Sequence, residues 1–256
     1  MGTLREAIEV VGASHTGLVR QNNEDTVWLI DRAFRSGVRG ARCDQIPESG
    51  VLVAVADGVG GAAAGEVASR WVAERMAARL GAVAHSADAG TRSTALQKLG
   101  STINRGLVRA AERDPQRRGM ATTYTGLLYC GDWAVYLHAG DSRLYTFAEG
   151  DLRQITRDHT LREERGDPSI PGNIITNCFG SLQGFYLDVG PVDFRATELL
   201  LLCSDGLSDY ADPTRIVEAL AQGGELPHLA RDLMQLALEG GGGDNVSLVL
   251  VRPVHA

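Results

Sequence analysis

Five aspartates in this sequence lie where an apolar, strand-like run begins or ends: Asp25, Asp57, Asp141, Asp205 and Asp244. A single aspartate at such a position is most often part of a turn, because its side chain caps the turn and a following glycine adopts a positive φ. Five of them together favour a second interpretation. Antiparallel strands can bring their ends to one edge of the sheets, where unpaired carboxylates would repel one another. A cation bound among them would relieve that repulsion.

The ligand types indicate which cation such a site would prefer. Carboxylate and backbone carbonyl oxygens suit hard cations such as Mg²⁺ or Mn²⁺ better than zinc or copper. Two such ions about 3.5–4 Å apart can bridge a water, lower its pKa and orient the resulting hydroxide for in-line attack on a phosphoryl group. Arg20, five residues before Asp25, offers a planar guanidinium that fits phosphate oxygens bidentately.

Helices and strands that could position these residues are visible in the apolar pattern. A four-residue apolar repeat predicts a helix over 64–80, and a second stripe predicts one over 94–113. Two further helices are expected, one that begins at Pro213 after an Asp212 cap and runs to about Gln222, and one from Leu226 to the glycines that begin at Gly240. Short β-branched or apolar runs predict strands over 26–30, 51–56, 123–130, 133–139, 144–147, 199–203 and 246–252.

The order of these elements indicates the fold class. Strands come first, then two helices, a run of antiparallel strands, two helices and a final strand. This grouping favours an α+β fold, with helices that cover antiparallel sheets, over alternating βαβ units. No linker or internal repeat divides residues 1–256, so we expect a single domain. The stretches 31–50 and 160–184 are expected to be irregular, and loops of that length are often functional.

Composition and charge argue against several classes of protein. The chain has 25 Lys and Arg against 32 Asp and Glu, and its net charge of −7 disfavours nucleic-acid binding. Its apolar runs are too short to span a membrane, and its first residues do not form a secretory signal, so we expect a soluble, cytoplasmic protein. The cysteines lack the close spacing of a zinc or redox site and are expected to be reduced thiols: Cys43, Cys130, Cys178 and Cys203.

The candidate site residues belong to short motifs that follow one another along the chain: Arg20-x-x-x-Glu24-Asp25, Val55-Ala56-Asp57-Gly58-Val59-Gly60-Gly61 with Gly65-Glu66, Met120-Ala121-Thr122-Thr123, Gly140-Asp141-Ser142-Arg143, Asp158-His159-Thr160, Ser204-Asp205-Gly206-Leu207 and Gly243-Asp244-Asn245. In this order, the motifs make the sequence resemble the metal-dependent Ser/Thr protein phosphatases of the PP2C (PPM) family. These motifs span Gly12 to Val251, which is nearly the whole chain. The sequence is most similar in this respect to a compact, stand-alone bacterial enzyme.

The resemblance implies a fold of two packed antiparallel β-sheets flanked by helix pairs, with a flap-like segment at about 160–184. It also implies that Asp57, Asp205 and Asp244 are the catalytic carboxylates. Asp57 would bridge two Mg²⁺ or Mn²⁺ ions, and the Gly58 carbonyl would complete one shell. Asp205 and Asp244 would hold the other ion. The nucleophile would be the hydroxide that bridges the two metals, with no phospho-enzyme intermediate.

Further roles follow from the same resemblance. Asp25, together with Glu24, would act through metal-bound waters. Asp141 and Asp205 would form a third, weaker metal site, and Arg20 would clamp the phosphate. Asn245 and Glu24 would support the metal ligands without binding an ion directly.

The sequence departs from the family pattern in two places. Val59 lies where eukaryotic members carry a histidine thought to protonate the leaving group, so a metal-bound water or the third metal is expected to do that work. His15 is better explained as a surface or turn residue, and His159 as structural. Asn177 to Gly180 replace a usual arginine before an apolar-Gly pair, which concerns protein-substrate preference more than chemistry.

The expected function is therefore a phosphatase that hydrolyses phosphoserine and phosphothreonine in proteins, including a partner Ser/Thr kinase, as a monomer. The alternative is a catalytically weak PP2C-like regulatory or phosphoprotein-binding module. Loss of a metal-binding aspartate would favour that alternative, and none of the expected aspartates is missing. Phosphatases with an aspartyl nucleophile need an Asp-x-Asp pair, whereas this chain has Asp57-Gly58-Val59.

Overall fold

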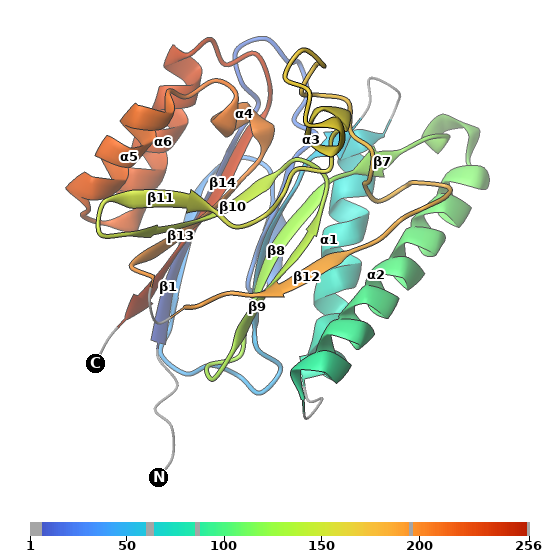
Figure 1. The fold of residues 1–256 in the computed structure, drawn as a ribbon, viewed down its shortest axis with the longest axis horizontal. Helices are drawn as coiled ribbons and strands as arrows, with labels where there is room; N and C mark the ends of the chain where they lie inside the picture. Colours follow the sequence, from blue (N-terminus) through green and yellow to red (C-terminus); the bar gives the residue numbers. More distant parts are fainter. Residues whose placement is uncertain (1–6, 60–63, 85–87, 195–196, 255–256) are drawn as a thin grey trace.

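Two six-stranded antiparallel sheets pack face to face in the computed structural model, and a pair of helices covers the outer face of each sheet (Figure 1). The structure describes residues 7–59, 64–84, 88–194 and 197–254. This arrangement confirms the predicted α+β fold of two packed sheets flanked by helix pairs.

The first sheet has the strand order β11-β10-β13-β14-β1-β4. Its strands are β11 (Asp151–Gln154), β10 (Arg143–Ala148), β13 (Leu199–Cys203), β14 (Val246–Val254), β1 (Ala7–His15) and β4 (Gly37–Cys43). The first long strand of the chain therefore pairs with the last, in an antiparallel register that runs from Ala7 opposite Val254 to His15 opposite Val246.

The second sheet has the order β12-β9-β8-β5-β2-β3. Its strands are β12 (Asp188–Pro191), β9 (Ala134–Ala139), β8 (Tyr124–Tyr129), β5 (Val51–Ala56), β2 (Thr26–Leu29) and β3 (Arg32–Phe34). A separate two-stranded ribbon joins β6 (Gly58–Val59) to β7 (Ala121–Thr122), directly after β5 and directly before β8. The ribbon thereby places Gly58 and Val59 at the end of the second sheet.

Four long helices lie outside the sheets, as the apolar pattern predicts. The helices α1 (Gly65–Ala84) and α2 (Ala89–Glu112) cover the second sheet, and α5 (Pro213–Gln222) and α6 (Leu226–Glu239) cover the first (Figure 1). Aspartate caps begin two of them: Asp88 accepts from the backbone of Thr91 at 2.8 Å, and Asp212 from that of Thr214 at 2.7 Å. None of the helices that the structure describes is long and apolar enough to cross a membrane.

Three short helical segments complete the fold: η1 (Pro115–Arg117), α3 (Leu161–Arg165) and α4 (Asp205–Ser208). The segment 160–184 holds only α3, so the expectation of a largely irregular stretch is confirmed there. All four cysteines are free thiols, as expected.

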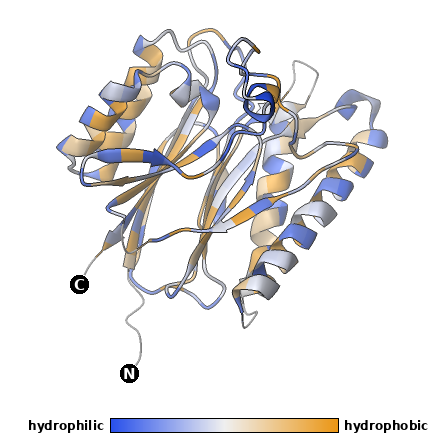
Figure 2. Cartoon of the chain, in the orientation of Figure 1, coloured by the Kyte–Doolittle hydropathy of each residue, from blue (hydrophilic) through white to orange (hydrophobic). Residues whose placement is uncertain are grey.

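The hydrophobic core forms three layers. One lies between the two sheets, one between the first sheet and α5 and α6, and one between the second sheet and α1 and α2. Figure 2 shows the corresponding apolar strands inside and hydrophilic segments along the outer helices. Because β5 and β13 are buried on both faces, they read as continuous apolar runs in the sequence rather than as alternating ones.

The structure corrects the sequence-based interpretation at several strands. The segment 31–50, expected to be irregular, contains β3 and the edge strand β4. Most of β4 is exposed and rich in Gly and Arg, so it lacks the apolar alternation that identifies a strand. The strands β1, β11 and β12 also lie outside the predicted runs. The strands β10 and β11 form an antiparallel hairpin, and Glu149 and Gly150 in its turn both have positive φ, of 53° and 81°.

Candidate metal-dependent active site

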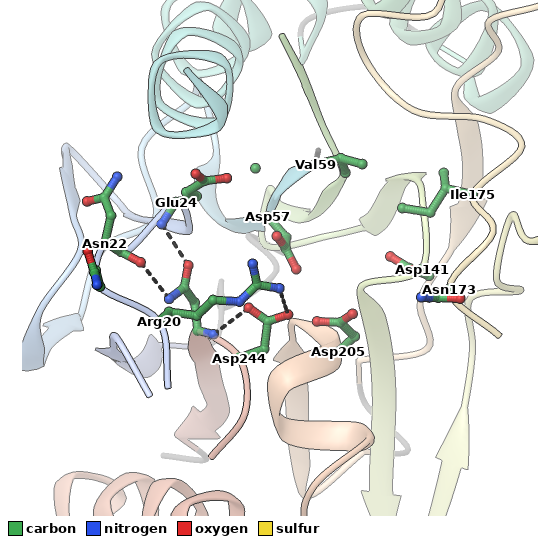
Figure 3. Close-up of a pocket in the computed structure, with 13 residues that line it drawn as sticks. Arg20, Asn22, Glu24, Asp57, Val59, Asp141, Asn173, Ile175, Asp205 and Asp244 are labelled. Atoms are coloured by element: carbon green, nitrogen blue, oxygen red, sulfur yellow. Dashed lines mark hydrogen bonds and ion pairs between the residues drawn. The ribbon is translucent and has the colours of Figure 1, made fainter. Parts of the chain in front are cut away.

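An acidic cleft of about 500 Å³ lies at the end of the sheets (Figure 3). The short helices α3 and α4 lie at this end of the molecule (Figure 1). The cleft is lined by Arg20, Gln21, Asn22, Glu24, Asp57, Gly58, Val59, Asp141, Asn173, Ile175, Asp205, Asp244 and Asn245. All of the site residues predicted from the sequence except Asp25 therefore line one cleft. The carboxylates of Asp57, Asp141 and Asp205 point into the same space (Figure 3).

Asp57 follows β5, and its backbone is fixed by two threonines of the segment that enters β8. The Asp57 amide donates to Thr123 Oγ1 at 3.0 Å, and its carbonyl accepts from the Thr123 amide at 2.8 Å and from Thr122 Oγ1 at 2.7 Å. Thr123 Oγ1 also bonds to the Ser142 hydroxyl at 2.7 Å. These bonds hold the backbone of Asp57, so its carboxylate is left to face the cleft.

Glycines let the backbone pack closely behind Asp57. A Cβ atom on Gly58 would overlap the backbone of Gly65, and one on Gly65 would overlap the carboxylate of Glu24. The sequence motif Asp57-Gly58, with Gly65 following, thus reflects a close approach of β6, the first turn of α1 and the chain before β2. Gly60 and Gly61, which belong to the same motif, lie outside the described residues.

Asn245 connects the end of the chain to the loop that carries Arg20 and Glu24. Its Oδ1 accepts from the Glu24 amide at 2.8 Å, and its Nδ2 donates to the carbonyls of Thr16 at 2.8 Å and Asn22 at 2.9 Å. Asp244 and Arg20 form an ion pair of 2.7 Å across the same junction (Figure 3). This hydrogen bond and the Asp244 charge raise the pKa of Arg20, which stays a cation.

Asp25 lies beneath the cleft rather than in its lining. Its side chain is fully buried, and Ser204 Oγ donates to its Oδ2 at 3.0 Å. Its Oδ1 and the Oδ1 of Asp205 are buried without a hydrogen-bond partner among the described residues. Buried carboxylate oxygens without partners are costly, and a bound cation would satisfy them.

Burial and mutual repulsion disturb the titration of this cluster. Burial first, then the charges of Asp25 and Asp205, raise the pKa of Asp57 well above its usual range. Burial and neighbouring carboxylates raise the pKa of Asp25 to about 7, of Asp141 to about 7 and of Asp205 to about 6. The ionised carboxylates are thus disfavoured in the absence of a counter-charge, and a bound cation would supply one.

The arrangement is an open cleft rather than a closed metal shell. Within the described part of the chain, no three His, Cys, Asp or Glu side chains gather tightly enough to hold one ion by themselves. The exclusively oxygen donor set and the two unpartnered carboxylate oxygens still fit hard cations that keep several waters. The residues present therefore fit Mg²⁺ or Mn²⁺ by donor chemistry.

The far wall of the cleft comes from the segment 160–184, through Asn173 and Ile175. Sequence reasoning missed both residues, and also Asn22, because nothing in their type or spacing distinguishes them. His159 is buried and bonds to Asp188 at 3.0 Å, and His15 accepts from the Gly17 amide in a turn. Neither histidine lines the cleft, which agrees with the structural roles predicted for them.

Comparisons with known proteins agree with this geometry. A family model described as protein phosphatase 2C matches residues 42–239. The serine/threonine protein phosphatase PstP of Mycobacterium tuberculosis is 36% identical over 99% of this chain, although the chain spans only 46% of that protein. The serine/threonine phosphatase stp of Listeria welshimeri is 30% identical, with 92% of each chain covered.

Solved structures give the same result for the fold. The crystal structure of the serine/threonine phosphatase Stp1 from Staphylococcus aureus has a TM-score of 0.81 at 28% identity, with 96% of this chain and 95% of that chain covered. The crystal structure of the Mycobacterium tuberculosis phosphatase PstP/Ppp has a TM-score of 0.76 at 33% identity, with coverage of 97% and 100%. The match to PstP/Ppp thus spans nearly the whole of both chains.

Proposed function

The chain belongs to the protein phosphatase 2C family, and from this membership and the acidic cleft we propose that it is a metal-dependent phosphatase of phosphoserine and phosphothreonine in proteins. The observation that carries the proposal is the meeting of Asp57, Asp205 and Asp244 in one cleft with Arg20. These residues are up to 224 positions apart in the sequence. If each aspartate only stabilised a local turn, the fold would not need to bring them together.

We assign the cleft carboxylates to two Mg²⁺ or Mn²⁺ ions, with a weaker third. Asp57 and the Gly58 carbonyl would hold one ion, Asp205 and Asp244 the other, and Asp141 with Asp205 the third. Asp25 and Glu24 would bind through water. Such ions, when bound, supply a water of lowered pKa and neutralise charge on the phosphoryl oxygens.

The chain's own residues do the remaining work in this proposal. Arg20 binds the peripheral phosphate oxygens bidentately and orients the phosphorus toward the carboxylates. The threonine bonds to the backbone of Asp57 keep its carboxylate aimed at the cleft. Val59, which also lines the cleft, has no proton to give, so the leaving oxygen must be protonated by solvent held in the cleft.

Partners and location belong to the same proposal. The substrates would be phosphorylated proteins, among them a partner Ser/Thr kinase. The enzyme would be a monomer and would act in the cytoplasm. The Listeria welshimeri relative supports only the substrate class in this proposal, because its name describes a serine/threonine phosphatase and the match covers most of both chains.

Phosphate release from a phosphothreonine peptide tests the function directly. We expect release with Mn²⁺, none with EDTA, and a loss of about a hundredfold or more in Asp57→Ala and Asp205→Ala. Asp232→Ala, which removes an exposed aspartate of α6, is the matched control and should retain full activity. Activity in EDTA, or equal activity in all three variants, would refute the proposal.

A further inference from the structure

The outer face of the α1–α2 helix pair carries a hollow that the acidic cleft does not involve. It measures about 470 Å³ and lies between the two helices. Trp71, Arg75 and Arg79 line it from α1, and Arg105 and Arg109 line it from α2. We call these five residues the arginine groove. The groove concentrates four positive charges on a chain whose net charge is −7.

The arginines of the groove lack acidic partners. Among the described residues, none of the four forms an ion pair, although eleven ion pairs involve other groups of the chain. Glu74, the nearest acid along α1, is held by Arg70 at 2.7 Å on the exposed side of that helix. Burial, followed by the charge of Arg79, lowers the pKa of Arg75. An anion in the groove would relieve this repulsion between like charges.

The geometry of Arg75 presents its guanidinium to a ligand. Its Cζ lies 3.8 Å from the centroid of the Trp71 ring, and one of its nitrogens donates weakly to the Trp71 carbonyl at 3.4 Å. Stacking holds the guanidinium flat while its outer edge stays available for a planar, bidentate anion such as a carboxylate. Gly106 makes room for this stack, because a Cβ there would lie 2.8 Å from the Trp71 ring.

The shape of the surface indicates an extended ligand. A second hollow of about 550 Å³ continues along α2, shares Thr102 and Arg105 with the arginine groove, and adds Lys98. A small compact anion would use only one of the two hollows. A polypeptide in an extended conformation, with acidic side chains at intervals, could pair with positive charges along both.

Other anionic polymers fit this surface less well. Base stacking on Trp71 would compete with Arg75, which already covers a face of the ring. A flat anionic membrane cannot enter a concave groove, and the exposed large apolar residues of the described chain all lie elsewhere, in segments 18–19 and 174–186. Charge complementarity and concavity together favour a peptide.

We propose that the arginine groove docks an acidic, extended segment of the phosphoprotein substrate, outside the catalytic cleft. The proposal rests on the proposed phosphatase function only for the identity of the protein that carries the segment. Binding of the segment itself can be measured without catalysis.

A binding experiment tests the groove by itself. The probe is a fluorescein-labelled peptide rich in Asp and Glu, without phosphate, and its Asn/Gln counterpart is the neutral control. We expect salt-sensitive binding to the parent protein, and a Kd about five- to tenfold higher for Arg105→Gln/Arg109→Gln. The matched variant Arg153→Gln/Arg231→Gln has the same net charge, removes exposed arginines of β11 and α6, and should bind like the parent.

A second experiment links the groove to the substrate. A phosphothreonine peptide is compared with the same peptide joined to the acidic segment by a flexible linker. The groove variant should lose the lower KM of the joined substrate and keep the parent's rate on the short one. Failure of every variant to release phosphate would reject the phosphatase function, while the binding experiment would still decide the groove.

Three outcomes would overturn the docking proposal. They are equal binding of the acidic and neutral peptides, equal Kd values for the two double variants, and tighter groove-dependent binding of anionic lipid vesicles or single-stranded RNA than of the peptide. Circular dichroism of both variants establishes that each is folded.

Discussion

Arg20 and Asp244 form an ion pair, with 2.7 Å between a guanidinium nitrogen of Arg20 and Oδ2 of Asp244. The two side chains are 53% and 28% exposed, so the pair is largely solvated and contributes little to stability. The ion pair matters because it competes with the ligands proposed for its two members. The same carboxylate is assigned to a metal ion and the same guanidinium to phosphate, so an ion at Asp244 would release Arg20 toward the substrate.

Replacement of Arg20 tests its role as a phosphate clamp. Arg20→Ala should raise KM for a phosphothreonine peptide about tenfold or more, because it removes a charge-assisted contact made before and during the reaction. Arg20→Lys should recover only part of the loss, since lysine keeps the charge without the planar fork. Steady-state kinetics decide the matter, and a fall in kcat at unchanged KM would contradict the clamp.

Removal of one buried charge should stabilise the metal-free protein. Asp57→Asn and Asp205→Asn each relieve repulsion within the cluster, so we expect the Tm in EDTA to rise by about 2–4 °C. Both variants should lose most of the Tm increase that Mn²⁺ gives the parent. Thermal unfolding with EDTA and with Mn²⁺ measures both effects, and Asp232→Asn is the exposed control. A lower Tm in EDTA would speak against the repulsive cluster.

The stability of the metal-free protein should depend on pH in a particular direction. Burial raises the pKa of Asp25 and of Asp141 to about 7, whereas aspartate in the unfolded chain has a pKa of about 3.9. Between these values the folded state binds more protons than the unfolded state, so stability falls as the pH rises from about 4 to about 7. Unfolding in EDTA across this range should show the fall, and saturating Mn²⁺ should reduce it. A flat profile in EDTA would contradict these raised pKa values.

Gly65→Ala tests the close packing behind the cleft. The added Cβ would overlap the Glu24 carboxylate, so we expect a loss of about 1–3 kcal/mol in unfolding free energy and weaker activity. Gly90→Ala, in the first turn of α2, is the control, because its Cβ would meet Asp88 only at an ordinary 3.4 Å. That change should stabilise the protein by up to about 1 kcal/mol. Chemical denaturation measures both, and equal effects would refute the packing argument.

The sequence predicts those parts of the fold that combine a strong apolar pattern with clear boundaries. Thus α5 begins at Pro213 after the Asp212 cap, and β5 ends where Asp57 begins, both as predicted. The edge strand β4 was not predicted, because its exposed Arg and Gly residues do not show the alternation of apolar and polar residues that identifies a strand. Edge position is a property of the sheet, and a single segment does not reveal it.

The candidate site shows a similar division. Asp57, Asp205 and Asp244 were identifiable because each follows or precedes an apolar run with glycine or asparagine beside it. Asn173 and Ile175 reach the cleft only because the chain of 160–184 folds back over it, with Thr160 paired to Ile175. No local pattern encodes that path. The burial of Asp25 beneath the cleft likewise depends on Ser204, which is 179 residues away.

The pairing of β1 with β14, together with the bonds of Asn245 to the loop before β2, has a consequence for biosynthesis. On the ribosome, β1 emerges early and can pair with β4, but its other edge stays unpaired until β14 has been made. Such a long delay predicts slow folding dominated by distant contacts. A nascent chain would therefore be unable to complete the acidic cleft until β14 and the adjoining Asp244 and Asn245 have been made and have docked.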